Sequence, residues 1–475
     1  MLIDGTWTAS STLRTQDVIN PADGAVVSTI PVASVEDLDR ALAAASRGAA
    51  VWKATTPWER SAVLRRTARI LAERHEDIAR VLTTEQGKTL AEARLEVGAA
   101  IDQFDWYADE AKRIYGRSVG SAQADLRLLV VREPVGAVAA FTPWNFPALL
   151  PARKLAPALA AGCSIILKPA EEAPSAALEL ARALTDAGLP DGVLGVVLGD
   201  PAQISAHLLS SPVIKKLSLT GSVQVGRHLM KAAADNITNV SMELGGHAPV
   251  LVFADADPIA AARMCAIGKF RNAGQVCVAP TRFYVHDSIA EAFIAEFIAV
   301  AAALRVGPGL DEGSQVGPLT SERRLVAVEE LVADAVAHGA TVAVGGARIP
   351  ELPGSFYSPT VLLDVPDDAA IMQTEPFGPV APISTFSSFG EAIERANSTP
   401  YGLAGYLFTN DLTTATRASE ELEVGMVGVN SFSVSLAQVP FSGVNLSGIG
   451  AENGTEALDS YLHSKTIALG IGPRA

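Results

Sequence analysis

The segment KFRNAGQVCVAP, residues 269 to 280, places Cys277 among small and polar residues in a chain that has only three cysteines. The other two, Cys163 and Cys265, lie in apolar periodic stretches, where a free cysteine is typically a small buried hydrophobe. Around Cys277, the glycine and amide residues allow unusual backbone dihedral angles and close approach of another group. This setting suits a thiolate nucleophile whose own backbone N–H faces the oxyanion that develops on an attacked carbon.

A second candidate for chemistry is Glu243, in MELGG, which ends a predicted strand and precedes two glycines that leave its carboxylate room to move. A lone glutamate at a strand end is usually a solvated surface residue. Here Val240, Met242 and Leu244 make the strand apolar, and burial raises the pKa of a carboxyl group. We therefore expect Glu243 to be buried and to titrate closer to neutral pH.

The segment LTGSVQVG, residues 219 to 226, turns a predicted strand into a predicted helix at Gly221, Ser222 and Gly226. Such a turn presents backbone N–H groups and the positive end of a helix, which together bind a pyrophosphate well. The usual GxGxxG fingerprint does not occur at this turn, so a dinucleotide site here would differ from the common pattern.

These segments need a scaffold that brings distant strand ends together. Residues 34 to 115 are rich in helix formers and predict a helical layer. From 134, and again from about 245, short apolar strands alternate with helices, which predicts an α/β fold with parallel sheets covered on both faces. The segments GRSVGSAQADLRLLVVRE and SYLHSKTIALG fit neither run, and such outlying strands are often interface material.

Composition limits the classes of function. The chain has 475 residues, of which 49% are hydrophobic, enough for two or three domains with a large core. A net charge of -15 disfavours nucleic acid as a partner. Three cysteines without CxxC spacing favour a reducing, cytoplasmic compartment and no metal site. Without a stretch of about 18 apolar residues or a signal-like N-terminus, we expect neither a membrane span nor secretion.

Six motifs in order resemble the aldehyde dehydrogenase superfamily, and the resemblance covers nearly the whole chain. The motifs are FTPWNFP (141 to 147), LKPAEEAP (167 to 174), LTGSVQVG (219 to 226), MELGGHAP (242 to 249), FRNAGQVCV (270 to 278) and EPFGPV (375 to 380). A single motif of this kind would be weak, whereas six at family-like separations leave little room for chance.

The resemblance implies three catalytic residues. Cys277 would attack the aldehyde as a thiolate. Asn145, in PWNFP, matches the family's side-chain donor to the oxyanion, although alone it could equally be a turn residue. Glu243 would be the general base that activates water to hydrolyse the thioester, and it could also help to deprotonate Cys277.

The resemblance also implies a dinucleotide site. Lys168 and Glu171 match residues that contact the adenosine ribose, while Glu375 and Phe377 match residues that hold the nicotinamide ribose and ring. The other implied cofactor-binding residues are Thr142, Pro143, Trp144, Gly221, Ser222, Gly226 and Leu244. A carboxylate at position 171 accepts bonds from a 2′-hydroxyl and repels a 2′-phosphate, so we expect NAD, with NADP tolerated in related enzymes that carry this glutamate.

Two arginines indicate the class of substrate. Arg153, expected about two helical turns into its helix, lies eight residues after Asn145, and Arg271 lies six before Cys277. Singly, they could be a helix-surface residue and a helix C-terminal cation. Together they match arginines that bind the distal carboxylate in succinate-semialdehyde dehydrogenases, and KFRNAGQVCVAPTRF also resembles 2-oxoglutarate-semialdehyde dehydrogenases. Ser435 and Phe441 are expected as further substrate contacts.

The fold that the resemblance implies has a Rossmann-type cofactor domain, an α/β catalytic domain and a small β oligomerisation arm. We expect the cofactor domain at 1–115 and 133–244, the catalytic domain at 245–455, and the arm at 116–132 and 456–475. The arm implies a homodimer or homotetramer.

Some positions depart from the family pattern, and other functions remain open. Ser442, Ala451 and His247 replace more common residues, and Glu452 aligns with a secondary carboxylate of some relatives. A CoA-acylating enzyme is one alternative, although that branch generally lacks the glutamate present here at 243. A general aldehyde dehydrogenase, a cysteine hydrolase and a non-catalytic binding protein are the others; the last two would leave the dinucleotide site or the catalytic groups without a purpose.

Overall fold

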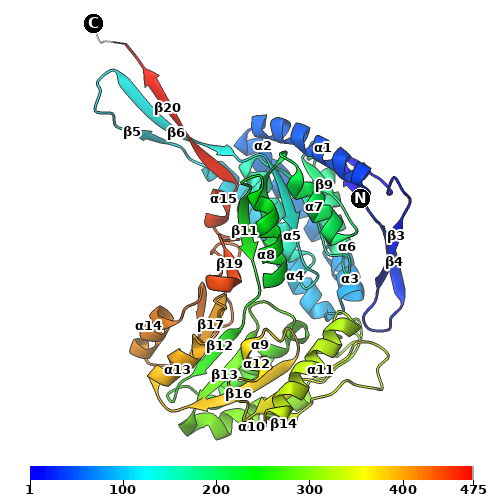
Figure 1. Ribbon diagram of the computed structural model, residues 1–475, viewed down its shortest axis with the longest axis vertical. Coiled ribbons are helices and arrows are strands. Elements are labelled where there is room, and N and C mark those ends of the chain that lie inside the picture. The colour runs from blue at the N-terminus through cyan, green and yellow to red at the C-terminus, as the bar shows by residue number, and fades with distance from the viewer. Residues whose placement is uncertain (473–475) are drawn as a thin grey trace.

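The computed structural model describes residues 1–472, which form two sheets, each covered by helices, and a projecting arm of strands (Figure 1). The last three residues of the predicted arm, 473–475, lie outside the described part. Within residues 1–472, none of the helices is both long and apolar enough to cross a membrane.

The first sheet has eight strands, and its central strands run parallel. In order these are β19 (Gly448–Ile449), β11 (Asn239–Glu243), β10 (Ile214–Thr220), β7 (Ala137–Phe141), β8 (Ser164–Lys168), β9 (Leu194–Val196), β1 (Leu2–Ile3) and β2 (Thr6–Trp7). All five residues of β7 are buried, as expected for a parallel strand covered on both faces.

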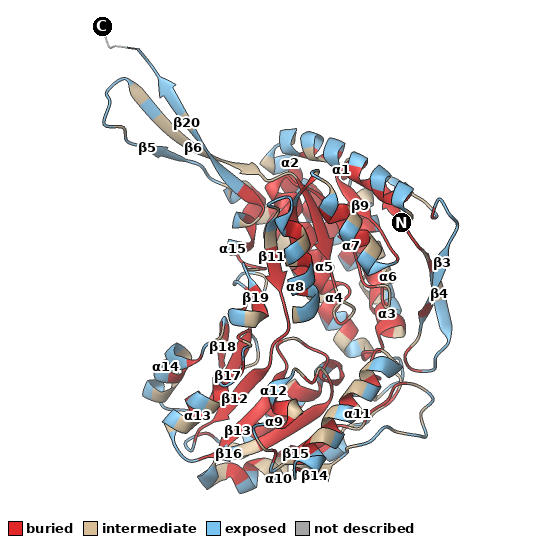
Figure 2. Cartoon of the chain, in the orientation of Figure 1, coloured by how far each residue is buried: buried red, intermediate tan, exposed pale blue. Residues whose placement is uncertain are grey.

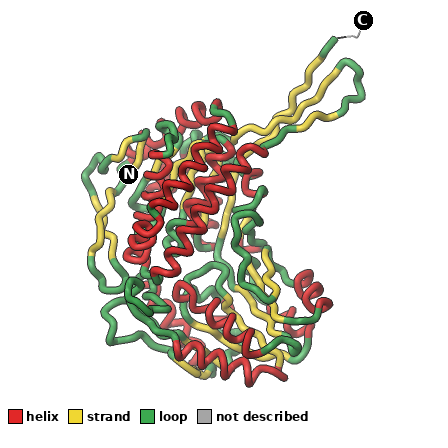
Figure 3. The backbone as a smooth tube through the Cα atoms, turned by 180° about the vertical axis from the view of Figure 1, so that it is seen from behind, coloured by secondary structure: helices red, strands yellow, loops and turns green. Residues whose placement is uncertain are grey.

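Helices cover both faces of this sheet, and alternation along the strands divides its core. Val138 and Ala140 pack in one apolar cluster, while Ala137, Ala139 and Phe141 pack in the other. The first cluster includes residues of α2 (Pro57–Glu73), α3 (His75–Gln86), α4 (Leu90–Glu110), α5 (Leu149–Ala161) and α6 (Ser175–Asp186). The second includes residues of α1 (Val35–Ala54), α7 (Pro201–Ser210) and α8 (Val223–Ala234). Figure 3 shows the sheet behind one of these helical layers.

The second sheet has seven strands, parallel except for one antiparallel pair at its edge, β14 with β15. Its order is β14 (Thr341–Val344), β15 (Thr360–Leu363), β16 (Val380–Phe386), β13 (Pro280–His286), β12 (Ala248–Val252), β17 (Ala404–Phe408) and β18 (Met426–Val429). The helices that follow its strands are α9 (Pro258–Phe270), α10 (Asp287–Ala303), α11 (Glu322–Ala337), α12 (Ala370–Gln373), α13 (Phe389–Ala396) and α14 (Leu412–Glu421). Figure 2 shows that the central strands of both sheets are buried.

The two outlying segments found in the sequence pair with each other in the arm. β20 (Leu462–Gly470) runs antiparallel to β6 (Leu126–Pro134) over nine residue pairs, and β5 (Arg117–Val119) adds a third strand on the other side of β6. The arm projects from the body and is largely exposed (Figures 1 and 2). The predicted α/β fold class is confirmed by the two covered, mainly parallel sheets.

The predicted domain boundaries remain a prediction, but the sheets show how the chain is divided. The first sheet ends along the chain at Glu243, and the second begins at Ala248. The chain later returns to the first sheet, because β19 pairs with β11. The short helix α15 (Glu456–Asp459) then buries Ala457 and Leu458 in the same core as α5.

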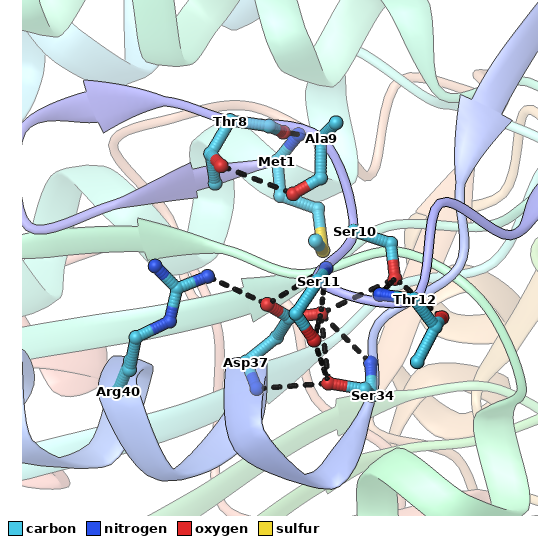
Figure 4. A network of polar contacts seen from close by, with 9 residues as sticks. All are labelled: Met1, Thr8, Ala9, Ser10, Ser11, Thr12, Ser34, Asp37 and Arg40. Atoms are coloured by element: carbon cyan, nitrogen blue, oxygen red, sulfur yellow. Dashed lines mark hydrogen bonds and ion pairs between the residues drawn. The ribbon is translucent and has the colours of Figure 1, made fainter.

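The N-terminal residues are fixed to α1 by one buried carboxylate (Figure 4). Asp37 accepts the Ser34 backbone N–H at 2.9 Å and the Ser11 backbone N–H at 3.2 Å, and it pairs with Arg40 at 2.6 Å. Burial alone would raise the pKa of Asp37, but the hydrogen bonds from Ser34, Arg40 and Ser11 outweigh it and lower that pKa to about 2. Asp37, the capping-box partner of Ser34 at the start of α1, therefore also anchors the chain that precedes a hairpin. This hairpin consists of β3 (Thr15–Ile19) and β4 (Val26–Pro31).

Two helix glycines give a matched test of this packing. A β-carbon on Gly48 of α1 would lie 2.2 Å from the carbonyl group of Gly192, whereas one on Gly98 of α4 would meet nothing within 4 Å. We expect Gly48→Ala to lower Tm, because overpacking costs about 1–3 kcal/mol. Gly98→Ala should raise Tm slightly, because alanine is favoured in helices by up to about 1 kcal/mol. Differential scanning calorimetry checks both variants, and an unchanged Tm for Gly48→Ala would contradict the tight contact.

Candidate active site

The predicted nucleophile lies on a loop whose backbone is unusual. Between α9 and β13, the 3-10 turn Arg271–Gly274 has positive φ at Asn272 (50°), Ala273 (52°) and Gly274 (72°). The first two are not glycine, so their left-handed conformation carries strain that the surroundings must hold. A β-carbon on Gly274 would lie 2.1 Å from the carbonyl oxygen of Gly378. The turn redirects the chain so that Cys277 lies on the loop before β13, half-buried.

The thiol of Cys277 is held in its neutral form. Its pKa is raised to about 12, mainly by burial, and the charges of Glu375 and Glu243 act in the same direction. Arg153 is the charged group that most opposes this effect, and the backbone N–H of Val278 also favours the thiolate. The nucleophile therefore needs a base close by, and both Glu243 and Arg153 are near enough to alter its pKa.

Asn145 is positioned against the same loop. Its Nδ2 donates to the carbonyl oxygen of Gln275 at 3.1 Å, two residues before Cys277. An amide carries two N–H groups, so a second one is left for another acceptor. Its Oδ1 is buried without a hydrogen-bond partner. The side chain can therefore stabilise an oxyanion formed at Cys277.

Glu243 ends β11 and is 2% exposed, and neither of its carboxyl oxygens has a hydrogen-bond partner. Burial raises the pKa of Glu243 well above its ordinary value, and the charge of Glu452 adds to this effect. Lys154 and Arg153 act in the opposite direction. A carboxyl group in this environment binds a proton readily, as a general base must.

The sequence did not identify Lys154, a cation that lowers the pKa of Glu243. Lys154 is fully buried and donates from Nζ to Glu452 at 2.6 Å and to Ser218 at 3.1 Å. Thr220 donates to the same carboxylate oxygen at 3.3 Å. A lysine among the apolar residues of a predicted helix was the available signal, because a buried lysine must find a partner.

The turn that was predicted to bind pyrophosphate lies directly beside Glu243. The backbone N–H of Gly221 donates to the Glu243 carbonyl at 3.0 Å, and Ser222 caps α8 by accepting from Val225. Gly226 is required for close packing, since a β-carbon there would lie 2.7 Å from the Leu244 side chain. The N-terminus of α8 is thus free to bind an anion at the strand ends of the first sheet.

The residues expected at the adenosine ribose also lie at these strand ends. Lys168 is the last residue of β8, and its ammonium pairs with the carboxylate of Glu171. Thr142 directly follows β7, and its hydroxyl oxygen is buried without a partner. An unpartnered buried hydroxyl beside a helix N-terminus fits a dinucleotide that would supply the missing hydrogen bond.

The residues expected at the nicotinamide end come from the second sheet. Glu375 accepts the backbone N–H of Gly246 at 3.3 Å, and burial raises the pKa of Glu375 to about 8. A β-carbon on Gly245 would lie 2.3 Å from the Glu375 carboxylate, so this position must be glycine for the carboxylate to stay there. Phe377 lies edge-on to Trp144 with ring centroids 5.5 Å apart, which joins the two predicted cofactor segments.

Three of the predicted substrate residues form one group. Arg153 is the fifth residue of α5, one turn from its start rather than the two expected, and it is 3% exposed. Its Nη2 donates to Ser435 at 2.5 Å, and its guanidinium lies 4.3 Å from the centroid of the Phe441 ring. Its Nε has no partner, and among residues 1–472 no carboxylate forms an ion pair with it. This is a buried cation that lacks an anion.

Arg271 does not join this group. It is exposed, and its guanidinium lies 5.9 Å from the centroid of the Phe146 ring, next to Asn145. Arg153 is among the charges that act on the Cys277 thiol, whereas Arg271 is not. Arg153 therefore acts on the nucleophile from a buried position, and Arg271 lies at the surface.

Comparison with known proteins defines the class to which this site belongs. The model of the "Aldehyde dehydrogenase family" matches residues 7–467, so the chain belongs to the aldehyde dehydrogenase family. The membership confirms the resemblance. The catalytic roles of Cys277 and Glu243, which the resemblance implies, stay predictions.

Relatives and solved structures match along almost the whole chain. The chain is 43% identical to the glutarate-semialdehyde dehydrogenase of Pseudomonas putida and 42% identical to the succinate-semialdehyde dehydrogenase [NADP(+)] of Escherichia coli, in both cases over 99% of this chain and 97% of the relative. It is 44% identical to the 3-sulfolactaldehyde dehydrogenase of Pseudomonas putida, over 98% of this chain and 96% of the relative. The crystal structure of betaine aldehyde dehydrogenase from Staphylococcus aureus in complex with NAD+ superposes with a TM-score of 0.97 at 36% identity, covering 100% of this chain and 95% of that one.

The raised pKa of Glu243 has a consequence for stability. Above its ordinary pKa of 4.5, the unfolded chain releases this proton while the folded chain keeps it, so rising pH favours unfolding. Glutamine cannot ionise, and Glu243→Gln removes this contribution. We expect the variant to melt above the wild type at pH 8, and the difference in Tm to shrink toward pH 5. A difference that does not change with pH would mean that the carboxyl group is already ionised in the folded protein.

Proposed function

We propose that the protein oxidises an aldehyde that carries a carboxylate at its far end, such as succinate semialdehyde or 2-oxoglutarate semialdehyde, with NAD(P) as oxidant. The observation that carries this proposal is Arg153, a buried guanidinium near Cys277 that lacks a carboxylate partner. Guanidinium groups bind carboxylates through two charge-assisted hydrogen bonds. The glutarate- and succinate-semialdehyde dehydrogenases among the relatives support this class of substrate.

The proposed chemistry begins with attack of the Cys277 thiolate on the aldehyde carbon, after Glu243 takes the thiol proton. Asn145 Nδ2 and the Cys277 backbone N–H would stabilise the oxyanion of the adduct, and one such donor typically contributes about 3–4 kcal/mol. NAD(P), held at its nicotinamide end by Glu375 and Phe377, would supply the acceptor for the hydride that leaves this carbon. Glu243 releases the thiol proton to solvent before a water molecule attacks the resulting thioester, so its carboxylate can accept the proton of that water. The expelled Cys277 thiolate then takes this proton back from Glu243. The products are the acid, one proton in solvent and a free Cys277 thiol, so the cycle closes.

Water is favoured over CoA as the acceptor of the acyl group. Both oxygens of Glu243 are unpartnered and its pKa is raised, so it can accept a proton from water at the thioester. A CoA-acylating enzyme does not need such a base, because the thiol of CoA is itself a good nucleophile. Release of the acid without added CoA distinguishes the two reactions.

We also propose that NAD is used more efficiently than NADP. Glu171 lies at the expected ribose position and pairs with Lys168, so its carboxylate would repel a 2′-phosphate. The nicotinamide adenine dinucleotide seen in the betaine aldehyde dehydrogenase fits this preference, whereas the named E. coli relative uses NADP(+). Initial rates with each cofactor at fixed aldehyde give the two kcat/KM values. A higher value for NADP would overturn the preference.

A sulfonate-bearing aldehyde is the second candidate substrate. The relative named for 3-sulfolactaldehyde is 44% identical, slightly more than the semialdehyde relatives. A sulfonate also accepts two bonds from a guanidinium, but it is tetrahedral and bulkier than a carboxylate. The space that Phe441 and Ser435, which both contact Arg153, leave around its guanidinium would therefore decide between the two substrates.

The substrate experiment compares kcat/KM for succinate semialdehyde, 2-oxoglutarate semialdehyde, a sulfonate-bearing aldehyde of similar length and butanal. We expect the wild type to prefer a carboxylate-bearing substrate over butanal by at least about 100-fold, since charged hydrogen bonds that replace an unpaired buried charge contribute several kcal/mol. Arg153→Ala should remove this preference while leaving butanal turnover within about 5-fold.

Two further variants separate the reaction from the substrate. Cys277→Ser should lose turnover of every aldehyde, because it removes covalent catalysis. Arg271→Ala serves as the matched arginine control and should lose less of the carboxylate preference, because Arg271 is exposed. Equal efficiency of the wild type on butanal and the semialdehydes would leave a general aldehyde dehydrogenase.

We propose further that the arm lies in a subunit interface of a homodimer or homotetramer. The apolar residues Val119 and Leu469 are 41% and 44% exposed on strands of the arm. An exposed, three-stranded sheet with open edges is readily covered by a second chain. Light scattering at micromolar concentration should give at least twice the chain mass of 49.4 kDa, and the mass of a single chain would refute the interface.

A further inference from the structure

Three charged residues lie at the start of α4. Glu92 and Glu96 are four residues apart and share one side of the helix, and Lys88 lies just before the capping residue Thr89. The side chains of Lys88 and Glu96 are each 1% exposed, and Lys88 Nζ lies 2.5 Å from Glu96 Oε2. None of the three was identified as a functional residue from its sequence motif.

Lys88 and Glu96 form hydrogen bonds to the backbone of the segment that contains Asn145, the proposed oxyanion donor. Lys88 Nζ donates to the backbone carbonyl of Asn145 at 2.8 Å, and it also lies 4.1 Å from the centroid of the Phe146 ring. Glu96 Oε1 accepts the backbone N–H groups of Ala148 at 2.8 Å and Leu149 at 3.2 Å. The ion pair therefore fixes the backbone on both sides of the segment from Asn145 to Leu149.

Glu92 forms a hydrogen bond to the backbone of the segment that contains Cys277, the proposed nucleophile. Its Oε1 accepts the backbone N–H of Asn272 at 2.6 Å, and its other oxygen is held by Thr89 at 2.9 and 3.0 Å. Asn272 is the first of the left-handed residues before Cys277. The contact therefore holds the strained turn at the point where it leaves α9.

The Asn145 segment and the Cys277 loop are also hydrogen-bonded to each other. Asn272 Nδ2 donates to the carbonyl of Asn145 at 3.0 Å, the same oxygen that accepts from Lys88. Asn145 Nδ2 in turn donates to the carbonyl of Gln275, and Thr320 donates its backbone N–H to Gln275 Oε1 at 3.0 Å. The oxyanion donor and the nucleophile loop thus form one buried hydrogen-bond network that is anchored on α4.

A buried ion pair is poorly explained by stability alone. Removing two charges from water costs free energy that their attraction often does not recover, and apolar residues of similar size are commonly as stable. Here the other hydrogen bonds of the Lys88–Glu96 pair go to backbone of the reacting segments: Lys88 donates to the Asn145 carbonyl, and Glu96 accepts from Ala148 and Leu149. The catalytic effect of an oxyanion donor depends on placement to within a fraction of an ångström.

We propose that Lys88, Glu92 and Glu96 are positioning residues that set the Asn145 amide against the Cys277 loop. The inference rests on the proposed catalytic roles of Asn145 and Cys277 and adds the groups through which their relative placement is fixed. Lys88 acts through the Asn145 backbone, and Glu92 acts through the Asn272 backbone. None of the three needs to touch the substrate.

The test is a double-mutant cycle between this group and Asn145. The variant Lys88→Met/Glu96→Gln removes both buried charges together, and its glutamine oxygen can still accept from Ala148 and Leu149. We expect kcat/KM for succinate semialdehyde to fall at least about 30-fold, with Tm near that of the wild type and the dissociation constant of NADH, measured by fluorescence, within about twofold. In an Asn145→Ala background, the same two substitutions should cost less than about threefold, since the group that they position is already absent.

The outcomes separate this inference from the proposed function. If Asn145→Ala alone retains full activity, its proposed role fails and the positioning role fails with it. If Asn145→Ala loses activity but the two losses multiply, the role of Asn145 stands and the positioning inference is overturned. Lys112→Met, in the turn just after the end of α4, where the lysine is partly exposed, is the matched control and should leave kcat/KM unchanged.

Glu92→Ala keeps the inference testable if the Lys88 variant does not fold. Glu92 is only half-buried, so its truncation should be tolerated. The variant frees the backbone of Asn272, and we expect kcat/KM to fall about 10-fold while iodoacetamide still alkylates Cys277, since alkylation needs no oxyanion donor. A loss smaller than twofold in a folded Glu92→Ala protein would overturn the inference.

Discussion

Exclusion of water from the reacting groups is the constraint on which the site depends. Burial is the largest cause of the raised pKa of Cys277, Glu243 and Glu375, and each of these groups is thereby held closer to its neutral form. A buried neutral thiol is inert until a base removes its proton, and a buried neutral acid becomes a base only when its surroundings favour release of the proton. The fixed cations Arg153 and Lys154 supply that opposing field. The low dielectric that suppresses ionisation also strengthens every hydrogen bond to a developing charge.

The fold creates this environment because strand ends of the first sheet and loops of the second sheet converge. Thr142 and Lys168 lie at the ends of parallel strands of the first sheet, and Glu243 ends another, which is where ligands bind in open α/β sheets. The second sheet contributes loops rather than strand ends, namely the turn before Cys277 and the segment containing Glu375. The glycines at 245, 246 and 274 allow these loops to approach closely enough to exclude solvent.

The sequence predicted the groups whose chemistry is carried by a local motif. Cys277 stood out among polar neighbours, Glu243 ended an apolar strand, and the α/β alternation was clear, because each signal lies within a few residues. Arg153 was recognised, but its distance from the start of the helix was not, since the segment before Leu149 has no capping signal. The network of Lys88, Glu96 and Asn145 could not be predicted, because its members are brought together by tertiary packing between segments about 50 residues apart. The separation of Arg271 from Arg153 depends on the same packing.

The long pairing of β20 with β6 determines when the molecule can be completed. β6 is synthesised before either sheet is complete, yet its partner β20 lies more than 300 residues later. The elements that complete the first sheet and its core, β19 and α15, come shortly before β20. Contacts of such large sequence separation form late, since the loop between them must close first. The strands β19 and β20 therefore complete the fold last. A chain interrupted during synthesis after the second sheet would contain Cys277 and Glu243 but would leave the edge of β11 unpaired. Such a chain exposes the unpaired edge of β11 to aggregation, whereas in the finished chain β19 pairs with that edge.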